Sequence, residues 1–305
     1  MAPSDLSRAQ FLGLAAGAAA SLLAGRAGAS AAMLTRRIPS SGHALPVVGL
    51  GTWRTFDAGP GAERDGLAEV LRVLFAAGGS VIDSSPMYGR SEDAVGDLLE
   101  RTGLQSRAFL ATKVWTTGRE AGIRQMERSM ALLRRDRIEL MQVHNLLDWQ
   151  THLGTLRDWQ AAGRIGHLGV THYTASAHDA LEAVMRAEPL DFVQINYALD
   201  DRAVERRILP LAAERGMAVL VNQPFGGGGL LRSLRGRPLP DFAGELDCTS
   251  WAQILLKFLL GHPAITCVIP GTSRPAHMAD NAAAGRGPLP DAAMRRRIVA
   301  AWEAG

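Results

Sequence analysis

Short apolar runs recur along the chain beyond residue 33, and segments with a helical hydrophobic period separate them. The eight runs begin at Val47, Val81, Phe109, Glu139, His167, Phe192, Ala218 and Ile265. Intervening segments such as 66–78 and 122–135 carry apolar residues every three or four positions, which is typical of amphipathic helices. Strands that alternate with helices pair in parallel through crossover connections. The pattern therefore predicts an α/β protein with a parallel sheet.

Eight such units fit a single-domain (β/α)8 TIM barrel, a fold of about 250 residues. A doubly wound open sheet is the structural alternative, but it normally carries a G-x-G-x-x-G turn after its first strand. Here the first run leads into GLGTWRTFD, which has the wrong glycine spacing. Upstream, residues 34–46 read as a β-hairpin with Ser-Gly at its tip, which we expect to close the barrel floor. We assign residues 32–305 to the barrel.

Residues 1–31 have the layout of a signal peptide. Arg8 precedes an apolar, small-residue run from Phe11 to Gly25, and the small residues 27–29 supply a cleavage pattern. At about 1.5 Å per residue the run is too short to cross a hydrocarbon core of roughly 30 Å as a helix. We therefore expect cleavage of this segment and no stable membrane anchor.

The stretch SRAQFL at residues 7–12 resembles the twin-arginine export motif, with Ala9 in place of the second arginine. The resemblance implies a periplasmic or exported protein that uses the twin-arginine translocation machinery, which carries folded proteins. The alternative is a cytoplasmic protein whose chain starts at Met33.

Charge and cysteine content narrow the functional class. The net charge is only +3, and no basic stripe alternates with aromatic residues, so we expect no nucleic-acid partner. Cys248 and Cys267 match neither metal-ligand spacing nor a C-x-x-C pair, so we expect no metal site. Each cysteine suits the core, and a single disulfide between them is the alternative.

Four residues with complementary chemistry follow or end the predicted strands, where barrels place their reactive groups. Asp83, Lys113 and His144 end the second, third and fourth runs, and Tyr88 lies five residues beyond Asp83. Reduction of a carbonyl by hydride needs a proton donor, and Tyr88 can serve if a cation lowers its ordinary pKa of about 10. Lys113 is the expected cation and Asp83 its partner, while His144 can orient the substrate oxygen.

These four residues lie in segments that resemble the catalytic motifs of the aldo-keto reductases: VIDSSPMYG, ATKVW and LMQVHN. The segments GRIGHLGVTHY, VQINYAL and IPGTSRPAHMADN are similar to that family in order and placement, so the resemblance spans residues 34–305. It implies an NAD(P)H-dependent oxidoreductase that reduces small-molecule aldehydes or ketones, with NADP as cofactor and NAD as the alternative. It also leaves open a redox-sensing or partner-binding barrel with little turnover, and a monomer or weak oligomer.

The resemblance further implies a cofactor held across the barrel mouth and contacted by residues in or after the last four strands. These are Thr171, His172, Gln194, Asn222, Gln223, Pro224, Phe225, Gly226, Gly271, Thr272, Ser273, Arg274, His277 and Asn281. Three positions depart from the family. His172 replaces a common Asn, Asn222 replaces an aromatic ring under the nicotinamide, and His277 replaces an arginine at the 2′-phosphate. We expect Arg274 to compensate for the last change.

Four further residues fall just past strand ends and are expected to line the substrate pocket: Trp53, Met87, Trp115 and Asn145. The two indoles favour flat or apolar carbonyl compounds. Burial in the core is the alternative for each of them, because tryptophan is usually mostly buried.

Overall fold

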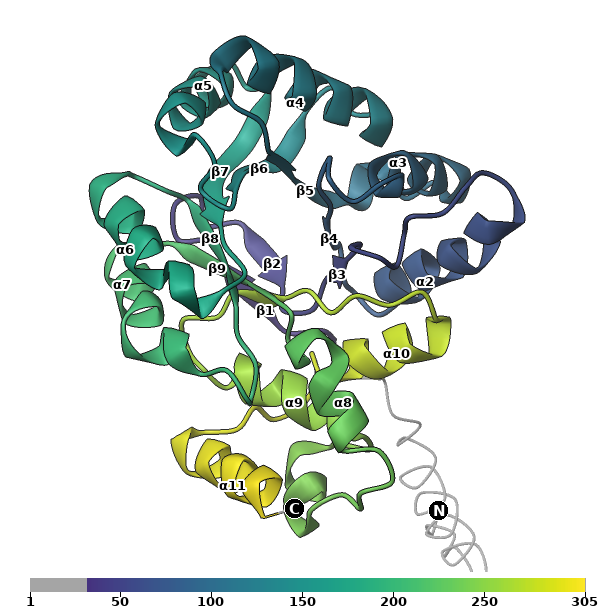
Figure 1. The fold of residues 1–305 in the computed structure, drawn as a ribbon. Helices are drawn as coiled ribbons and strands as arrows, with labels where there is room; N and C mark the ends of the chain where they lie inside the picture. Colours follow the sequence, from purple (N-terminus) through teal and green to yellow (C-terminus); the bar gives the residue numbers. More distant parts are fainter. Residues whose placement is uncertain (1–31, 305) are drawn as a thin grey trace, which may run out of the picture. The chain divides into compact units, whose positions relative to one another are not determined.

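The computed structural model describes residues 32–304, so the predicted signal peptide lies outside the described residues (Figure 1). Eight parallel strands follow a short N-terminal hairpin, and each predicted apolar run contains or leads into one of them. The strands are β3 (Leu50–Gly51), β4 (Val81–Asp83), β5 (Phe109–Val114), β6 (Ile138–His144), β7 (Ile165–Thr171), β8 (Phe192–Asn196), β9 (Ala218–Asn222) and β10 (Cys267–Val268). The prediction of eight strands is confirmed.

The eight strands form a barrel and not an open sheet. Each strand is hydrogen-bonded to its neighbour in chain order, from β3 to β10. Parallel bridges Val48↔Val268 and Gly51↔Gly271 then join the first strand segment to the last. Sequential parallel strands whose ends meet define the (β/α)8 barrel, and the doubly wound alternative is wrong.

Helices surround the barrel because each crossover must return to the same end of the sheet. They are α2 (Asp65–Ala76), α3 (Ser91–Thr102), α4 (Arg119–Leu133), α5 (Trp149–Ala161), α6 (His178–Ala187), α7 (Ile208–Glu214), α8 (Gly229–Ser233), α9 (Trp251–Leu260), α10 (Pro275–Ala283) and α11 (Ala292–Glu303). In α2, Leu67, Val70, Leu71 and Leu74 are buried, as the helical period predicted. Among residues 32–304, no helix is long and apolar enough to cross a membrane.

Inward-facing residues change from apolar to polar along the strands. Successive inward positions are two residues apart, because side chains alternate between the faces of a strand. On β5 the series is Phe109, Ala111 and Lys113, all buried. The series Val81 to Asp83 and Ala218 to Asn222 likewise run from an apolar to a polar residue. Polar side chains therefore collect at the carboxyl ends of the strands.

The predicted hairpin closes the opposite end. Strands β1 (Thr35–Arg37) and β2 (Ala44–Pro46) pair antiparallel, and Gly42 at the turn adopts φ 71°. Ile38 and Leu45 have no exposed surface and join the apolar cluster formed by the inward residues of the barrel. Both cysteines are free and buried, and Cys267 belongs to the same cluster. The hairpin thus seals the floor, as expected from the sequence.

Candidate active site

A buried ion pair lies at the centre of the barrel mouth. Lys113 Nζ lies 2.7 Å from Asp83 Oδ2 and donates a second hydrogen bond to the Ser84 carbonyl oxygen at 2.7 Å. Gln194 Nε2 and Gln142 Nε2 donate to the other oxygen of Asp83 at 2.8 and 3.4 Å. Because Lys113 is fully buried and Asp83 nearly so, these contacts replace the water that each charge has lost.

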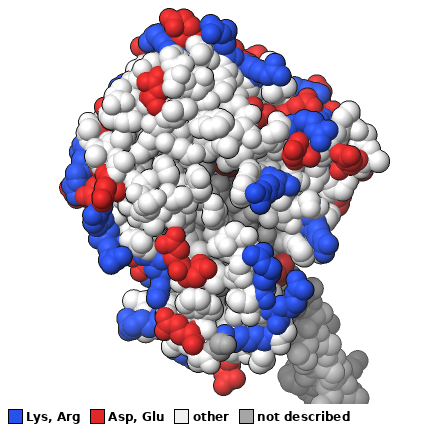
Figure 2. All heavy atoms as spheres, in the orientation of Figure 1, with Lys and Arg blue, Asp and Glu red and all other residues white. Residues whose placement is uncertain are grey.

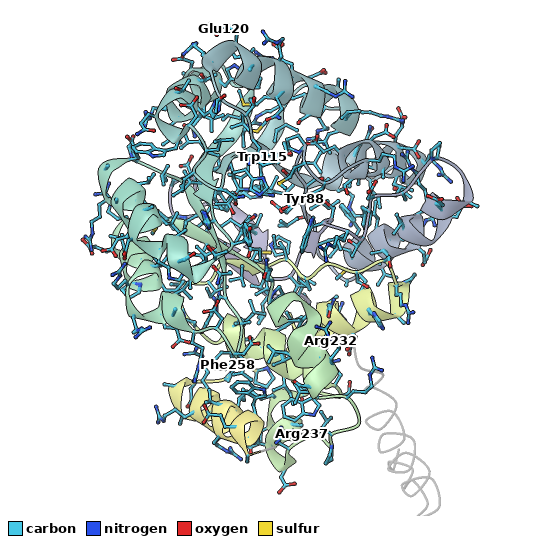
Figure 3. All side chains as sticks on the ribbon, in the orientation of Figure 1. Tyr88, Trp115, Glu120, Arg232, Arg237 and Phe258 are labelled. Atoms are coloured by element: carbon cyan, nitrogen blue, oxygen red, sulfur yellow. The ribbon has the colours of Figure 1, made fainter. Side chains whose placement is uncertain are left out.

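Tyr88 lies beside Lys113, and Figure 3 shows Tyr88 near the centre of the barrel. Lys113 Nζ is 5.1 Å from the centroid of the Tyr88 ring. Burial is the largest influence on the phenol and raises the pKa of Tyr88, while the Lys113 charge opposes that rise. The expectation that Lys113 lowers the pKa below its ordinary value is therefore wrong: loss of water around the phenolate outweighs the nearby ammonium. Tyr88 is a neutral phenol at pH 7.

His144 completes the group from the end of β6. Its ring stands edge-on to Tyr88, with centroids 6.0 Å apart, and its Nδ1 lies 3.2 Å from Ser85 Oγ. Burial, reinforced by the positive charge of Lys113, lowers the pKa of His144 from 6.5 to about 3. His144 is consequently a neutral imidazole in the physiological range. The structure brings together all four residues that the sequence singled out for catalysis.

Residues of β7 and β8, and of the loop after β7, add further polar groups to the mouth. Thr171 Oγ1 donates to Gln194 Oε1 at 3.1 Å, so Gln194 bridges Thr171 and Asp83. The backbone N–H groups of Tyr173 and Thr174 lie 3.0 and 3.3 Å from His172 Nδ1 and donate to it. Since Nδ1 accepts these bonds and burial lowers the pKa of His172, the ring proton is on Nε2.

The end of β9 leads into a segment that glycine makes possible. Asn222 Oδ1 is buried without a hydrogen-bond partner among the described residues. Gln223 has φ 48°, and the three glycines 226–228 have φ of 56°, 60° and 89°, which L side chains rarely adopt. Pro224 and Phe225 are buried, and Phe225 packs in the main hydrophobic core.

The end of β10 leads into the start of α10. Gly271 is bridged to Gly51 across the barrel seam, and the Arg274 N–H donates to Thr272 Oγ1 at 3.1 Å. Asn281 is buried within α10, whereas the predicted residues Ser273, Arg274 and His277 are exposed. The first N–H groups of a helix favour a bound anion.

Known proteins share the sequence features of this barrel. The model of the aldo/keto reductase family matches residues 47–302, which include every residue discussed at the mouth. The chain belongs to the aldo/keto reductase family.

Relatives and solved structures agree with this assignment. The aldo-keto reductase YhdN of Bacillus subtilis is 28% identical over 227 residues, covering 69% of this chain and 66% of YhdN. The NADP-dependent D-sorbitol-6-phosphate dehydrogenase of Malus domestica is 24% identical over 282 residues, covering 79% of this chain and 86% of that protein. A Klebsiella pneumoniae aldo-keto reductase solved with NADPH superposes with a TM-score of 0.74 at 25% identity, covering 88% and 95% of the two chains.

Large apolar side chains surround the mouth of this aldo/keto reductase. Trp53, Met87 and Trp115 are 44%, 39% and 40% exposed, so they do not belong to the core. Asn145 has φ 53°, and its Oδ1 is buried without a partner among the described residues. In Figure 2 this end of the barrel is hollowed near its centre, with uncharged side chains on one side and Lys or Arg on the other.

Sequence reasoning missed several residues at this site. Tyr173 is 48% exposed and stacks on His172, with ring centroids 5.6 Å apart. Its position two residues after Thr171, the end of β7, was the available signal. Ser85 and Gln142 contact His144 and Asp83, and no local pattern marked them.

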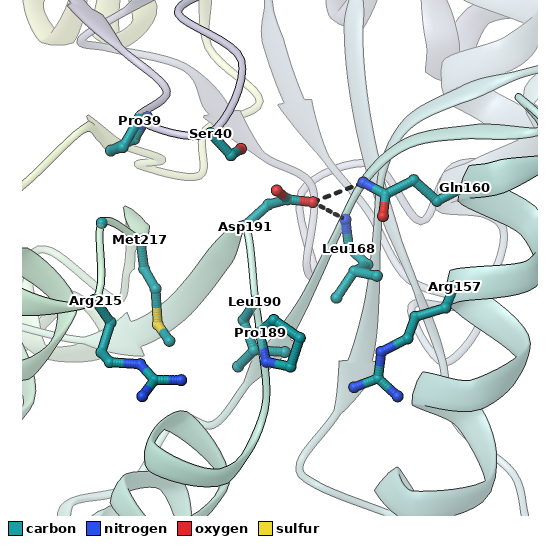
Figure 4. Close-up of a pocket in the computed structure, with 11 residues that line it drawn as sticks. Pro39, Ser40, Arg157, Gln160, Leu168, Pro189, Leu190, Asp191, Arg215 and Met217 are labelled. Atoms are coloured by element: carbon teal, nitrogen blue, oxygen red, sulfur yellow. Dashed lines mark hydrogen bonds between the residues drawn. The ribbon is translucent and has the colours of Figure 1, made fainter.

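A separate hollow of about 710 Å³ lies at the floor of the barrel (Figure 4). Pro39 and Ser40 of the hairpin line it, together with Arg157 and Arg215 on opposite sides. Asp191 at its back accepts hydrogen bonds from Gln160 Nε2 and the Leu168 N–H. None of the predicted site residues borders this hollow. In residues 32–304, no group of three or more His, Cys, Asp or Glu side chains is arranged to hold a metal ion.

Proposed function

We propose that the protein reduces aldehyde or ketone carbonyls to alcohols with NADPH, using Tyr88 as the general acid. The convergence of Asp83, Tyr88, Lys113 and His144 at the barrel mouth carries the proposal. A neutral phenol beside a buried ammonium can release a proton at the moment when negative charge develops on a nearby oxygen.

The mouth fits a dinucleotide cofactor. Asn222 Oδ1 is a buried acceptor that has no hydrogen-bond partner within residues 32–304, as expected of a group that meets a ligand. Gly271 and the start of α10 offer backbone N–H groups to a phosphate, and Thr171 and Gln194 lie beside Asp83. We expect these residues to hold NADPH, which supplies the hydride when bound. The named relatives include an NADP-dependent dehydrogenase and a structure with NADPH, which supports the choice of cofactor.

Residues of this chain then supply the proton and bind the carbonyl oxygen. Hydride adds to the carbonyl carbon while Tyr88 Oη gives its proton to the carbonyl oxygen, and the product is the alcohol. Lys113 stabilises the phenolate that remains, and Asp83 keeps the ammonium in place. When Nδ1 of neutral His144 accepts from Ser85 Oγ, which lies 3.2 Å away, the ring proton is on Nε2, and this N–H can donate a hydrogen bond to the same carbonyl oxygen. Its pKa of about 3 keeps it from competing as the acid.

Turnover of purified protein tests this proposal. We expect loss of NADPH absorbance when 4-nitrobenzaldehyde is added, with NADH giving a lower rate. Tight NADPH binding without turnover of any aldehyde would favour the partner-binding or redox-sensing barrel. Absence of nicotinamide binding would contradict the proposal altogether.

We also propose that residues 1–31 direct export of the folded protein through the twin-arginine machinery to the periplasm. The support is the sequence: the run at 11–25, the small residues 27–29 and the SRAQFL segment. Cell fractionation followed by N-terminal sequencing tests it. A periplasmic chain that begins near residue 30 is expected, whereas a cytoplasmic chain beginning at Met33 would contradict it.

A further inference from the structure

The backbone of Trp115 is held by one side chain of the neighbouring helix. The Trp115 N–H donates to Gln125 Oε1 at 2.5 Å, and Gln125 Nε2 donates to the Trp115 carbonyl oxygen at 3.1 Å. Gln125 is the seventh residue of α4, and it is partly buried. A single amide group thus satisfies both backbone groups of a loop residue, as a neighbouring strand would.

The same loop is fastened at two further points. His152 Nε2 lies 2.7 Å from the Thr116 carbonyl oxygen, and the Gly118 N–H donates to Asp148 Oδ2 at 2.7 Å. These contacts come from α5 and from the loop after β6, so they do not depend on Gln125. Loss of the Gln125 amide should therefore free Trp115 locally while the rest of the loop stays in place.

The clamped residue presents its indole beside the reacting groups. The Trp115 ring centroid lies 6.3 Å from that of His144, whose ring also contacts Tyr88, and Figure 3 shows both Trp115 and Tyr88 toward the centre of the barrel. The side chain is 40% exposed although it is large and apolar. An exposed ring on a fixed backbone loses less conformational freedom when a flat molecule stacks on it than a ring on a loose one.

We propose that Gln125 is a positioning residue that fixes Trp115 beside His144 and thereby makes the enzyme select aromatic over small aliphatic carbonyl compounds. The inference rests on the proposed carbonyl reduction and names the substrate class for that site. An aromatic substrate gains a ring contact with the indole, which is worth about three- to tenfold in binding. A short aliphatic aldehyde reaches Tyr88 without that contact.

Steady-state kinetics of Gln125→Ala test the proposal, with 4-nitrobenzaldehyde and butanal as substrates. We expect KM for the aromatic aldehyde to rise about fivefold, as for loss of one ring contact. The kcat for both aldehydes and KM for butanal should stay at wild-type values. Arg124→Ala is the matched control, because Arg124 is an exposed neighbour on α4 and makes neither of the two hydrogen bonds to Trp115. It should change neither KM.

A double mutant separates positioning from a general loosening of the fold. Trp115→Ala should lose the same aromatic preference, and adding Gln125→Ala to it should cost nothing more, because Gln125 acts through Trp115. Unchanged aromatic KM in Gln125→Ala, an equal rise for both aldehydes, or additive losses in the double mutant would overturn the proposal. A wild type that is inert with both aldehydes would instead overturn the proposed function, and this inference with it.

Discussion

The floor and the mouth of the barrel are built from the same strands, yet different interactions hold the side chains of the two ends in place. At the floor, Ile38 and Leu45 fill the space between apolar inward residues such as Phe192, and this inner cluster contains only apolar side chains and Cys267. At the mouth, the same strands end in the buried pair of Asp83 and Lys113. The interior of the barrel at the floor therefore depends on apolar packing, whereas the interior at the mouth depends on hydrogen bonds and charge.

Backbone conformation shows the same division. Of the seven non-glycine residues with positive φ in residues 32–304, five follow strands at the mouth: Arg54, Asn145, Leu146, Asp148 and Gln223. Such conformations cost about 1 kcal/mol or more each and cluster at functional sites. The strained loops thus lie where ligands are expected, which agrees with the general placement of active sites in barrels.

Removal of the buried cation should have the largest effect. Lys113→Met leaves the Asp83 carboxylate buried without its charge partner, so we expect a loss of about 3–5 kcal/mol in the free energy of unfolding, together with loss of turnover. Urea unfolding and NADPH oxidation measure the two effects. The Asp83→Asn/Lys113→Met double variant should recover part of the stability and none of the activity. Full stability in the single variant would show that the pair is not buried as described.

A cavity at the floor should reduce stability alone. Leu45→Ala removes a fully buried side chain and is expected to lower the free energy of unfolding by about 3 kcal/mol. Turnover per folded molecule should stay at the wild-type value, because Leu45 lies at the end opposite Tyr88. A fall in kcat per folded molecule in Leu45→Ala would contradict the view that packing at the floor does not affect the active site.

His144 should link stability to pH at the mouth. The pKa of His144 is lowered from 6.5 to about 3 in the folded protein. Between these two pH values, His144 is therefore protonated in the unfolded chain and neutral in the folded one. The stability present above pH 6.5 is lost as the pH falls. His144→Asn should remove up to about 1.4 kcal/mol per pH unit from this slope. Urea unfolding measured at intervals between those two pKa values tests it, and Leu45→Ala should keep the wild-type slope.

The smallest expected effect concerns the choice of cofactor. Arg274→Ala removes an exposed cation at the start of α10, so we expect KM for NADPH to rise by about fivefold, the most that one exposed ion pair usually contributes. KM for NADH, which lacks the 2′-phosphate, should not change. A rise for both cofactors would assign Arg274 to the shared part of the dinucleotide.

Much of the fold follows from local patterns, and less of the site does. Eight buried strands leave continuous apolar runs, and chain order then places Asp83, Lys113 and His144 at one end. The pKa of Tyr88 could not be predicted, because its direction depends on how closely other loops exclude water from the phenol. The hydrogen bonds between Gln125 and Trp115 could not be predicted either. The two residues lie ten positions apart, and they meet only when α4 packs beside the end of β5.

Turnover of Tyr88→Phe tests the central claim most directly. The variant keeps the ring and its packing against Lys113 and removes only the hydroxyl group that carries the proton. We predict a fall in kcat of about a hundredfold or more, as for loss of a general acid, with NADPH binding and the free energy of unfolding unchanged. A Tyr88→Phe protein that reduces 4-nitrobenzaldehyde at the wild-type rate would contradict the assignment of Tyr88 as the acid.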